Sequence, residues 1–289
     1  MGDNQLLLSV VIPISVASGK LERMKTWIEN VNFNECEIIM VHDVRDEGTQ
    51  KELEEFVTAI NNQNLRLFQG KWANPGGPRN EGIVQSLGHW IAFWDCDDTP
   101  NVENVFECLK KNQYTDVHVG GFQVVQTDSE IVTKTFTTEK IDDLYMNPGL
   151  WRMIFRKEVI GKTVFPELLM GEDQIFLMRL NIISRQVNFH PEIFYNYYVG
   201  NSSQLTRQAR AIKDLKFSIL ETFKYFMGTD TAERKLVGVM LIKQYLGLMK
   251  RNPLLGILKP SWLTLVAFQK SPIIIIQSFV KIMKNTAGK

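Results

Sequence analysis

The chain has 289 residues, of which 44% are hydrophobic and 22% are charged. These proportions are typical of a folded globular protein with one large domain, and they exclude wholesale disorder and fibrous repeats. Charge is distributed unevenly, because residues 1–208 carry 19 basic and 28 acidic side chains whereas residues 209–289 carry 14 and 4. We therefore expect the two parts to meet different partners.

The cysteines and the apolar segments indicate a cytoplasmic protein. Three cysteines form neither a CxxC pair nor a pattern spaced with histidine, from which we expect a reducing compartment and no structural zinc module. The N-terminus carries an acid where a secretory signal has basic residues, so secretion is not expected. Lysines interrupt the C-terminal apolar stretch, and no run approaches the ~20 residues that cross a bilayer.

Apolar runs of strand length alternate with helical patterns over the first hundred residues. The predicted strands are residues 6–12, 37–41, 65–68 and 89–94, and the predicted helices are residues 21–31, 53–60 and 79–87. Strands buried on both faces that alternate with helices predict βαβ units, and so an α/β fold with a mostly parallel sheet. Ligands bind at the carboxyl ends of such strands, so polar residues that directly follow a strand are the first candidates for a site.

Beyond residue 98 the pattern becomes mixed. Thr99-Pro100 predicts a helix cap with proline in the first turn, leading to a helix that ends near Asn112. Two of the later strands are expected to be joined through Gly120-Gly121. The other predicted elements are strands at residues 117–119, 122–125 and 131–136, an apolar helix at residues 175–183, and helical, basic structure from residue 209 onward.

The sharpest candidate site is Asp95-Cys96-Asp97-Asp98, directly after the strand at residues 89–94. Side chains two residues apart in an extended segment point the same way, so Asp95 and Asp97 converge. Two close carboxylates repel each other unless a cation lies between them, and Mg²⁺ or Mn²⁺ is the natural occupant because it prefers oxygen ligands and binds substrate phosphates. The structural alternative is that Asp97 or Asp98 caps the next helix while Asp95 is solvated.

A second acid occupies the equivalent place in the sheet. Asp43 follows the second strand as Asp95 follows the fourth, so both are expected on the same edge. The alternative is that Asp43 is a turn residue before a helix that Thr49 caps. His42 precedes it, and a single histidine at a strand end is more often structural than catalytic.

A series of segments supports a more specific interpretation. They are VVIP at Val10–Pro13, the acid-rich turn after residue 41, PGGPRNEGI at Pro75–Ile83, FWDCDD at Phe93–Asp98, LWRMIFR at Leu150–Arg156, GED at Gly171–Asp173, and FYNYY at Phe194–Tyr198 followed by SSQLTR at Ser202–Arg207. In this order they resemble the family 2 glycosyltransferases of the A-type (GT-A) fold. The resemblance covers residues 6–208.

The resemblance implies an inverting transfer of one sugar from a nucleotide-diphosphate sugar to a glycan or lipid-linked acceptor. It implies that Pro13, Asp43, Arg79 and Asp95 lie at the donor nucleotide. It also implies that Asp97, together with Asp95, binds Mn²⁺ or Mg²⁺, which stabilises the charge that the leaving diphosphate gains.

The resemblance makes Asp173 the candidate base that takes the proton of the acceptor hydroxyl. Asp173 begins an apolar and therefore buried helix, whose first turn can hold a carboxylate in a dry pocket. The alternative is that Asp173 only caps this helix. Glu172 is the expected neighbour that orients the base or contacts the acceptor, and Trp151 is the aromatic residue expected to stack on an acceptor sugar.

The C-terminal segment of residues 253–289 contains five lysines and no acid. Its lysine-edged apolar helices and Trp262 suit the surface of an anionic membrane, which predicts peripheral attachment at the inner face of the cytoplasmic membrane, near a lipid-linked acceptor. The alternative is a helical appendage that packs on the catalytic domain or on a second copy in a homodimer. Nucleic acid is not an expected partner, because the rest of the chain is acidic.

These observations predict a GT-A-like catalytic domain over residues 1–208 and a basic helical extension over residues 209–289, acting in bacterial lipopolysaccharide or capsule synthesis. One alternative is a catalytically inactive relative that binds nucleotide-sugar or glycan as a subunit of a polysaccharide assembly complex. A second is a nucleotidyltransferase, which the single glycine and single lysine of Ser15–Lys20 argue against, because such enzymes need a glycine-rich basic loop there.

Overall fold

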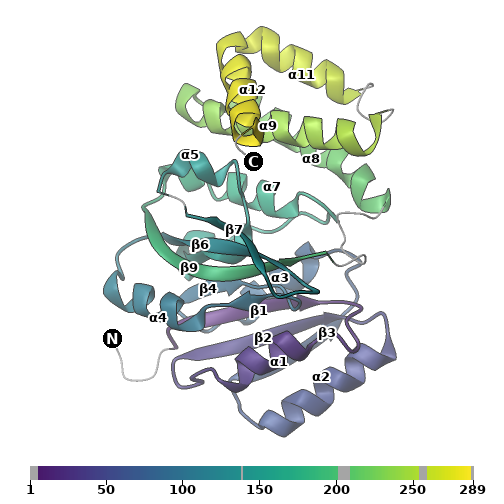
Figure 1. The fold of residues 1–289 in the computed structure, drawn as a ribbon, viewed down its shortest axis with the longest axis vertical. Coiled ribbons are helices and arrows are strands. Elements are labelled where there is room, and N and C mark those ends of the chain that lie inside the picture. The colour runs from purple at the N-terminus through teal and green to yellow at the C-terminus, as the bar shows by residue number, and fades with distance from the viewer. Residues whose placement is uncertain (1–5, 138, 201–208, 254–258, 288–289) are drawn as a thin grey trace. The chain divides into compact units, whose positions relative to one another are not determined.

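A computed structural model describes residues 6–137, 139–200, 209–253 and 259–287 (Figure 1). The described chain forms two compact units. Unit 1 takes residues from the ranges 1–139, 149–167 and 185–201, and unit 2 takes residues from the ranges 140–148, 168–184 and 202–289. The domain boundary expected at residue 208 stays a prediction.

Unit 1 is built on a mixed sheet, which within the described residues has nine strands in the order β3-β2-β1-β4-β8-β6-β9-β5, with β7 paired to β6. The strands are β1 (Leu8–Ile14), β2 (Cys36–Asp43), β3 (Leu65–Gly70), β4 (Trp90–Phe93), β5 (Thr99–Pro100), β6 (Val117–Gln126), β7 (Val132–Phe136), β8 (Met153–Arg156) and β9 (Val187–Val199). The first four strands are parallel, as the alternation of strand and helix patterns predicts. The sheet becomes mixed at β8, which is antiparallel to both β4 and β6.

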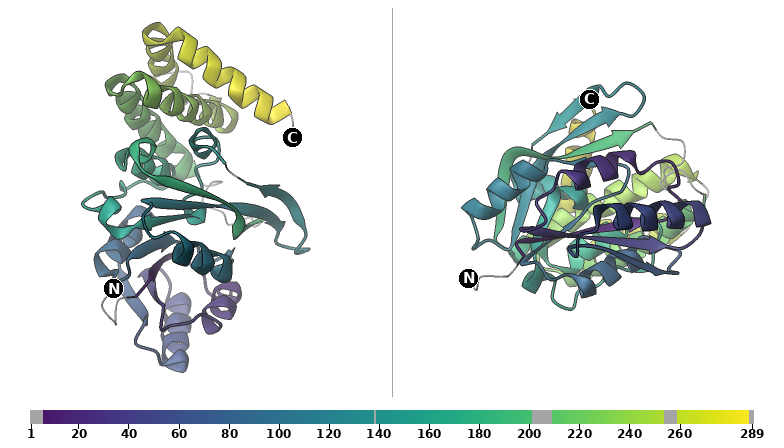
Figure 2. Two further views of the ribbon diagram at one scale, coloured as in Figure 1. Left: turned by 90° about the vertical axis from the view of Figure 1, so that its left-hand side faces the viewer. Right: turned by 90° about the horizontal axis from the view of Figure 1, so that it is seen from below.

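Helices cover both faces of this sheet (Figure 2). They are α1 (Glu22–Glu29), α2 (Glu47–Ile60), α3 (Gly76–Gln85) and α4 (Val102–Lys111), with the short turns η1 (Leu150–Arg152) and α6 (Lys157–Ile160). α1, α2 and α4 share one apolar core with β1 and β2, in which Met24, Leu53 and Val105 are completely buried. α3 packs on β1 and β2 so closely that a Cβ at Gly82 would overlap the side chain of Val11.

Thr99 and Pro100 form β5 rather than the start of a helix. Thr99 pairs with Asn196 and Pro100 pairs with Tyr195, both on β9, and α4 begins later, at Val102. The expected helix cap at Thr99-Pro100 is therefore wrong. The physical reason for this error is that the strand with which Thr99 and Pro100 pair lies far along the chain, so a local pattern cannot show the pairing.

The helix caps also differ from expectation. Asp46 rather than Thr49 caps α2, because its carboxylate accepts a hydrogen bond from the Thr49 N–H at 2.7 Å. Asn101 caps α4 through its side-chain oxygen. Capping by Asp97 or Asp98 was the structural alternative for the acidic segment, and it is wrong.

Gly120-Gly121 does not join two strands but lies inside one continuous strand, β6. A Cβ at Gly120 would overlap the ring of Phe194 on the neighbouring β9. The register of β6 and β9 shifts on either side of Gly121. Gly120 therefore lets β6 approach β9 closely, and Gly121 lies at an irregularity in their pairing. A glycine pair in the sequence looks the same whether it marks such a place or a turn.

Unit 2 is helical, as the pattern from residue 209 onward predicts. Its helices are α5 (Ile141–Leu144), α7 (Glu172–Arg179), α8 (Ala209–Gly228), α9 (Thr231–Arg251), α11 (Lys259–Lys270) and α12 (Pro272–Ala287), with the short turn η2 (Ile182–Ser184). α12 packs on α9, where a Cβ at Gly238 would lie 3.1 Å from both Ile274 and Ser278. α7 ends at Arg179, before the predicted residue 183, because Asn181 takes a left-handed φ of 49°.

Across the described ranges, none of the helices has by itself the length and apolar character needed to cross a bilayer. The segments Pro260–Lys270 and Pro272–Lys284 meet these criteria only as a pair, and they are bent by 119° relative to each other.

Candidate active site

The carboxyl ends of β1, β2 and β4 meet at one edge of the sheet. β1 ends with Pro13 and Ile14, and it is parallel to both neighbours, with Ile14 opposite His42 of β2. Asp43 is the last residue of β2, and the segment Asp95–Asp98 directly follows β4. The acids chosen from the sequence therefore belong to the same edge, which is where open α/β sheets bind ligands.

Arg79 and Asp95, which the sequence analysis assigned to the donor nucleotide, form an ion pair. Arg79 Nη2 lies 3.2 Å from Asp95 Oδ1, and the guanidinium carbon lies 5.6 Å from the ring centre of Phe165. The side chain of Arg79 is 10% exposed, whereas that of Asp95 is 31% exposed. α3 thus holds a nearly buried positive charge against an acid that solvent and ligands can reach.

Two tyrosines of β9 hold the acidic segment in place. The Tyr195 hydroxyl accepts a hydrogen bond from the Asp95 N–H at 2.9 Å, and the Tyr198 N–H donates to Asp98 Oδ1 at 2.7 Å. Asp98 and Tyr195 are both buried. Sequence analysis missed this role, because these tyrosines lie about 100 residues beyond the acidic segment in the chain.

Burial and mutual repulsion raise pKa values within this segment. Desolvation by the surrounding chain, together with the charge of Asp95, raises the pKa of Asp97 to about 6, although the residue keeps an exposed surface. Asp97 is exposed on the surface, so water screens part of this effect. Burial and the charge of Asp97 also raise the pKa of Asp98. Carboxylates that raise one another's pKa in this way fit a hard divalent cation with oxygen ligands.

Two basic residues that the sequence analysis did not select lie near the acidic segment. The positive charges of Arg23 and Lys20 lower the pKa of Asp97 and so oppose the effect of burial. Arg23 also pairs with Glu130 at 2.6 Å, and its guanidinium carbon lies 4.0 Å from the ring centre of Tyr198. The available sequence signal was their position just after β1, whose carboxyl end lies at the same edge.

Asp43 is engaged by protein groups. Its carboxylate accepts hydrogen bonds from the N–H of Trp72 at 3.0 Å, from the N–H of Ala73 at 3.2 Å and from Nε of Arg45 at 2.7 Å. Asp43 therefore fixes the loop after β3. Its contact with a nucleotide, like that of Pro13, stays a prediction.

His42 is completely buried, and neither of its ring nitrogens has a hydrogen-bond partner among the described residues. Burial lowers its pKa, so the ring is neutral. These properties agree with the structural role favoured for a single histidine at a strand end.

Trp151 lies in η1 and is only partly buried. Its ring is stacked with those of Tyr195 and Tyr197, with centroid distances of 4.7 Å and 5.3 Å. Phe122 meets it edge-on at 4.8 Å. This aromatic cluster occupies much of the Trp151 ring surface, and the expected stacking on an acceptor sugar stays a prediction.

Glu172 and Asp173 begin α7, which belongs to unit 2. The N-cap of α7 is Gly171, whose φ of 86° and closeness to Ser218 exclude a larger side chain. Asp173 is therefore not the capping residue, although its Oδ1 accepts a hydrogen bond from the Gln174 N–H at 2.8 Å. Its role as a base stays a prediction.

Comparison with known proteins gives the family. The model of glycosyl transferase family 2 matches residues 9–185. GalNAc(5)-diNAcBac-PP-undecaprenol beta-1,3-glucosyltransferase of Campylobacter jejuni is 23% identical over 188 residues, which are 60% of this chain and 59% of that protein. The putative glycosyltransferase EpsH of Bacillus subtilis is 23% identical over 69% of this chain and 63% of its own length. The match thus spans less than two thirds of either relative. An uncharacterized glycosyltransferase of Haemophilus influenzae is 20% identical over 86% of this chain and 98% of its own length.

Solved structures confirm the expected GT-A fold. S. aureus TarS 1-349 in complex with UDP-GlcNAc has a TM-score of 0.66 and 16% identity, with coverage of 96% of this chain and 81% of that chain. The mannosyltransferase PcManGT from Pyrobaculum calidifontis, in complex with GDP-Man and Mn²⁺, has a TM-score of 0.58 and 13% identity, with coverage of 96% and 87%.

Proposed function

Because this chain belongs to glycosyl transferase family 2 and is a glycosyltransferase, we propose that it transfers one sugar from a nucleotide-diphosphate sugar to a glycan or lipid-linked acceptor, with inversion at the anomeric carbon. The observation that carries this proposal is the ion pair of Arg79 with Asp95, next to Asp97 at the carboxyl end of β4. This edge of an open α/β sheet suits a nucleotide. The UDP-GlcNAc and GDP-Man complexes of the structural neighbours support a nucleotide-sugar donor.

Asp95 and Asp97 are the residues that would hold a divalent cation, Mn²⁺ or Mg²⁺. Their oxygen ligands fit such an ion, and desolvation together with the charge of Asp95 raises the pKa of Asp97. When bound, the cation supplies stabilisation of the charge on the leaving diphosphate. Arg79 and Arg23 would add protein charge on the same side, the first by holding Asp95 and the second by lowering the pKa of Asp97. The Mn²⁺ in the mannosyltransferase complex supports this assignment.

Asp173 is the proposed base that accepts the proton of the acceptor hydroxyl. The residues that follow it in α7, from Ile175 to Met178, are buried, so the first turn of this helix is firmly held. Gln174 next to it is fixed by a hydrogen bond from Gln244 Nε2 at 2.6 Å. A positioned base contributes about 10²–10⁴-fold in rate. Glu172 is buried beside it and is proposed to orient the base or the acceptor.

The proposed role is bacterial lipopolysaccharide or capsule synthesis at the inner face of the cytoplasmic membrane. The name of the Campylobacter relative, which contains a polyprenyl diphosphate acceptor, supports a lipid-linked substrate. An exposed apolar face on α11 and α12 supports membrane attachment. This face consists of Trp262, Leu265, Phe268, Ile273, Ile276, Phe279, Val280 and Met283. Lys270 and Lys284 are exposed on the same helices and suit anionic lipid headgroups.

The donor is tested by measuring the melting temperature of the full chain with UDP-, GDP-, CMP- and dTDP-sugars, each with and without Mn²⁺. We expect one nucleotide class to raise the melting temperature, and more so with Mn²⁺, because a ligand that binds only the folded state stabilises it. The absence of a response to every donor would contradict the proposal.

Catalysis is tested with Asp173→Asn, and Asp128→Asn, an exposed acid in the turn between β6 and β7, is the control. We expect Asp173→Asn to lower the rate of transfer or donor hydrolysis by about 10²–10⁴-fold while nucleotide binding is retained. Asp128→Asn should leave both unchanged. Donor binding without turnover in the unmodified chain would instead favour an inactive binding subunit.

A further inference from the structure

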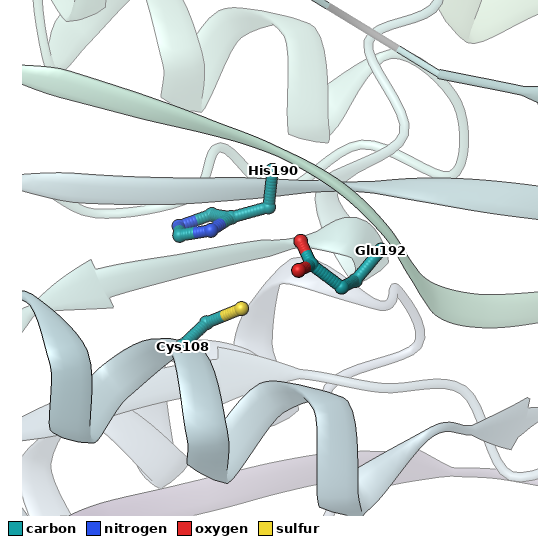
Figure 3. A group of neighbouring side chains, drawn as sticks. All are labelled: Cys108, His190 and Glu192. Carbon is teal, nitrogen blue, oxygen red and sulfur yellow. The ribbon is translucent and has the colours of Figure 1, made fainter.

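A second group of metal-ligating side chains lies between α4 and β9, in unit 1. Cys108 comes from α4, and His190 and Glu192 come from β9 (Figure 3). One ligand atom from each residue lies within 4.8 Å of the other two. Figure 3 shows the thiol, the imidazole ring and the carboxylate converging on the space between the helix and the strand.

A fourth residue orients the imidazole of this group. His118 Nδ1 lies 2.8 Å from His190 Nε2, and the two rings are stacked at 5.0 Å with an angle of 17° between their planes. When His190 donates this hydrogen bond, its Nδ1 keeps a lone pair for a cation, which is the usual arrangement of a metal-bound histidine.

The group leaves negative charge and polar atoms poorly compensated. Glu192 Oε2 is buried and has no hydrogen-bond partner among the described residues. Cys108 is 2% exposed, so its thiol is also shielded from water. A bound divalent cation compensates such a carboxylate, and a thiol that coordinates it is deprotonated.

We propose that Cys108, His190 and Glu192 bind a Zn²⁺ ion. One thiolate, one imidazole and one carboxylate are the ligand types that zinc combines, whereas Mg²⁺ and Mn²⁺ prefer oxygen ligands throughout. Three protein ligands leave a fourth position, which water would fill. This site is separate from the acidic segment, and spacing in the sequence could not indicate it because its ligands come from distant segments.

The ion would have a structural effect on the donor site. It would tie α4 to β9, and β9 carries Tyr195 and Tyr198, which hold Asp95 and Asp98. We therefore expect zinc to stabilise unit 1 and to keep the acidic segment ordered, without taking part in sugar transfer.

The test is the metal content of the purified full chain after incubation with equimolar Zn²⁺ and removal of unbound metal. We expect about one zinc per chain, a melting temperature that rises with zinc and falls with a chelator, and, with Co²⁺ in its place, the absorption band of a thiolate–cobalt bond. A chain that retains no zinc under these conditions would overturn the proposal without any variant.

Matched variants locate the site. Cys108→Ala and Glu192→Gln should lower zinc affinity at least about tenfold, and Cys108→Ala should also abolish the cobalt band. Cys36→Ala removes another buried thiol and should leave zinc binding unchanged. Asp97→Asn removes the proposed donor-site ligand and should also retain zinc, which separates this inference from the proposed function. Full zinc binding by folded Cys108→Ala, or loss of zinc in Asp97→Asn, would contradict the assignment.

Discussion

The hydroxyl of Tyr195 accepts a hydrogen bond of 2.9 Å from the backbone N–H of Asp95, a residue 100 positions earlier in the chain. Tyr195 is completely buried, and its hydroxyl also stabilises the charged form of Asp98. The backbone that follows β4 is thereby held by β9. Together with the ion pair of Arg79 with Asp95 and the hydrogen bond from Tyr198 to Asp98, this contact fixes the geometry of the acidic segment.

Tyr195→Phe removes this acceptor and leaves the Asp95 N–H without it. We expect the free energy of unfolding to fall by about 1–3 kcal/mol, because a buried donor loses its partner, and we expect weaker donor binding. Urea denaturation and nucleotide titration measure the two effects. Tyr114→Phe is the control, since Tyr114 is 89% exposed and its hydroxyl should contribute little. Equal free energies of unfolding for the two variants would show that the Tyr195 hydrogen bond does not contribute to stability.

Gly82→Ala tests the close packing of α3, the helix that carries Arg79. A Cβ at Gly82 would overlap the side chain of Val11, so the helix must move away from β1. We expect a loss of about 1–3 kcal/mol in the free energy of unfolding, measured by urea denaturation, and weaker donor binding through the displaced Arg79. The second change Val11→Ala should restore part of the stability, because it makes room for the new methyl group.

The control for this prediction is Gly228→Ala at the end of α8. No heavy atom of the described chain lies within 4 Å of the Cβ that this change adds, and the backbone is not left-handed. The substitution should therefore leave stability unchanged or raise it by about 0.4–1 kcal/mol. Equal losses for Gly82→Ala and Gly228→Ala would point to backbone flexibility rather than contact with Val11.

The parallel half of the sheet could be predicted because its signals are local. β1 to β4 and the helices between them follow from apolar runs and helical spacing within short windows. β5 could not be predicted, since Thr99-Pro100 becomes a strand only by pairing with Tyr195 and Asn196 of β9. The role of Gly120 could not be predicted for the same reason, since it makes room for Phe194, a residue of the distant strand β9.

Part of the candidate site could also be predicted from the sequence. Asp95 and Asp97 follow a strand and could be chosen by position alone, and Arg79 was placed near them by family resemblance. The sequence could not show that Asp43 uses its carboxylate to hold the loop at Trp72, nor that the charge of Arg23 lowers the pKa of Asp97. Both facts depend on which loops meet at the edge of the sheet.

Asp97 predicts a pH dependence of donor binding. Its pKa is raised to about 6, so protons compete with a cation for this carboxylate as the pH falls through that value. We expect Mn²⁺-dependent donor affinity to be full near pH 8 and to weaken progressively below about pH 6. Calorimetric titration across this range measures it. Asp97→Asn should bind donor weakly at every pH, with the dependence near pH 6 removed.

In the cation-free protein, the contribution of Asp97 to the free energy of unfolding should rise as the pH falls, whereas donor affinity falls. A carboxyl group whose pKa is raised on folding stabilises the fold while it is protonated, so this contribution is present below the ordinary value of 3.8 and is lost as the pH rises through about 6. Asp97→Asn should therefore be more stable than the unmodified chain near pH 8, with a difference that disappears below about pH 4. Urea denaturation at several pH values measures this difference. A constant difference across the range would mean that Asp97 does not titrate there.

The apolar face of α11 and α12 predicts binding to anionic vesicles. Ile273 is 69% exposed on this face, and transfer of such a side chain into a membrane contributes roughly 1.5–3 kcal/mol. We expect the full chain to sediment with vesicles of phosphatidylglycerol and phosphatidylcholine, less with phosphatidylcholine alone, and less at high salt, because Lys270 and Lys284 contribute through charge. Ile273→Glu should weaken binding by at least about tenfold. Ile131→Glu, at a residue 61% exposed in unit 1, should leave it unchanged. Dimerisation in solution that Ile273→Glu abolishes, without vesicle binding by the unmodified chain, would assign this face to a second copy instead.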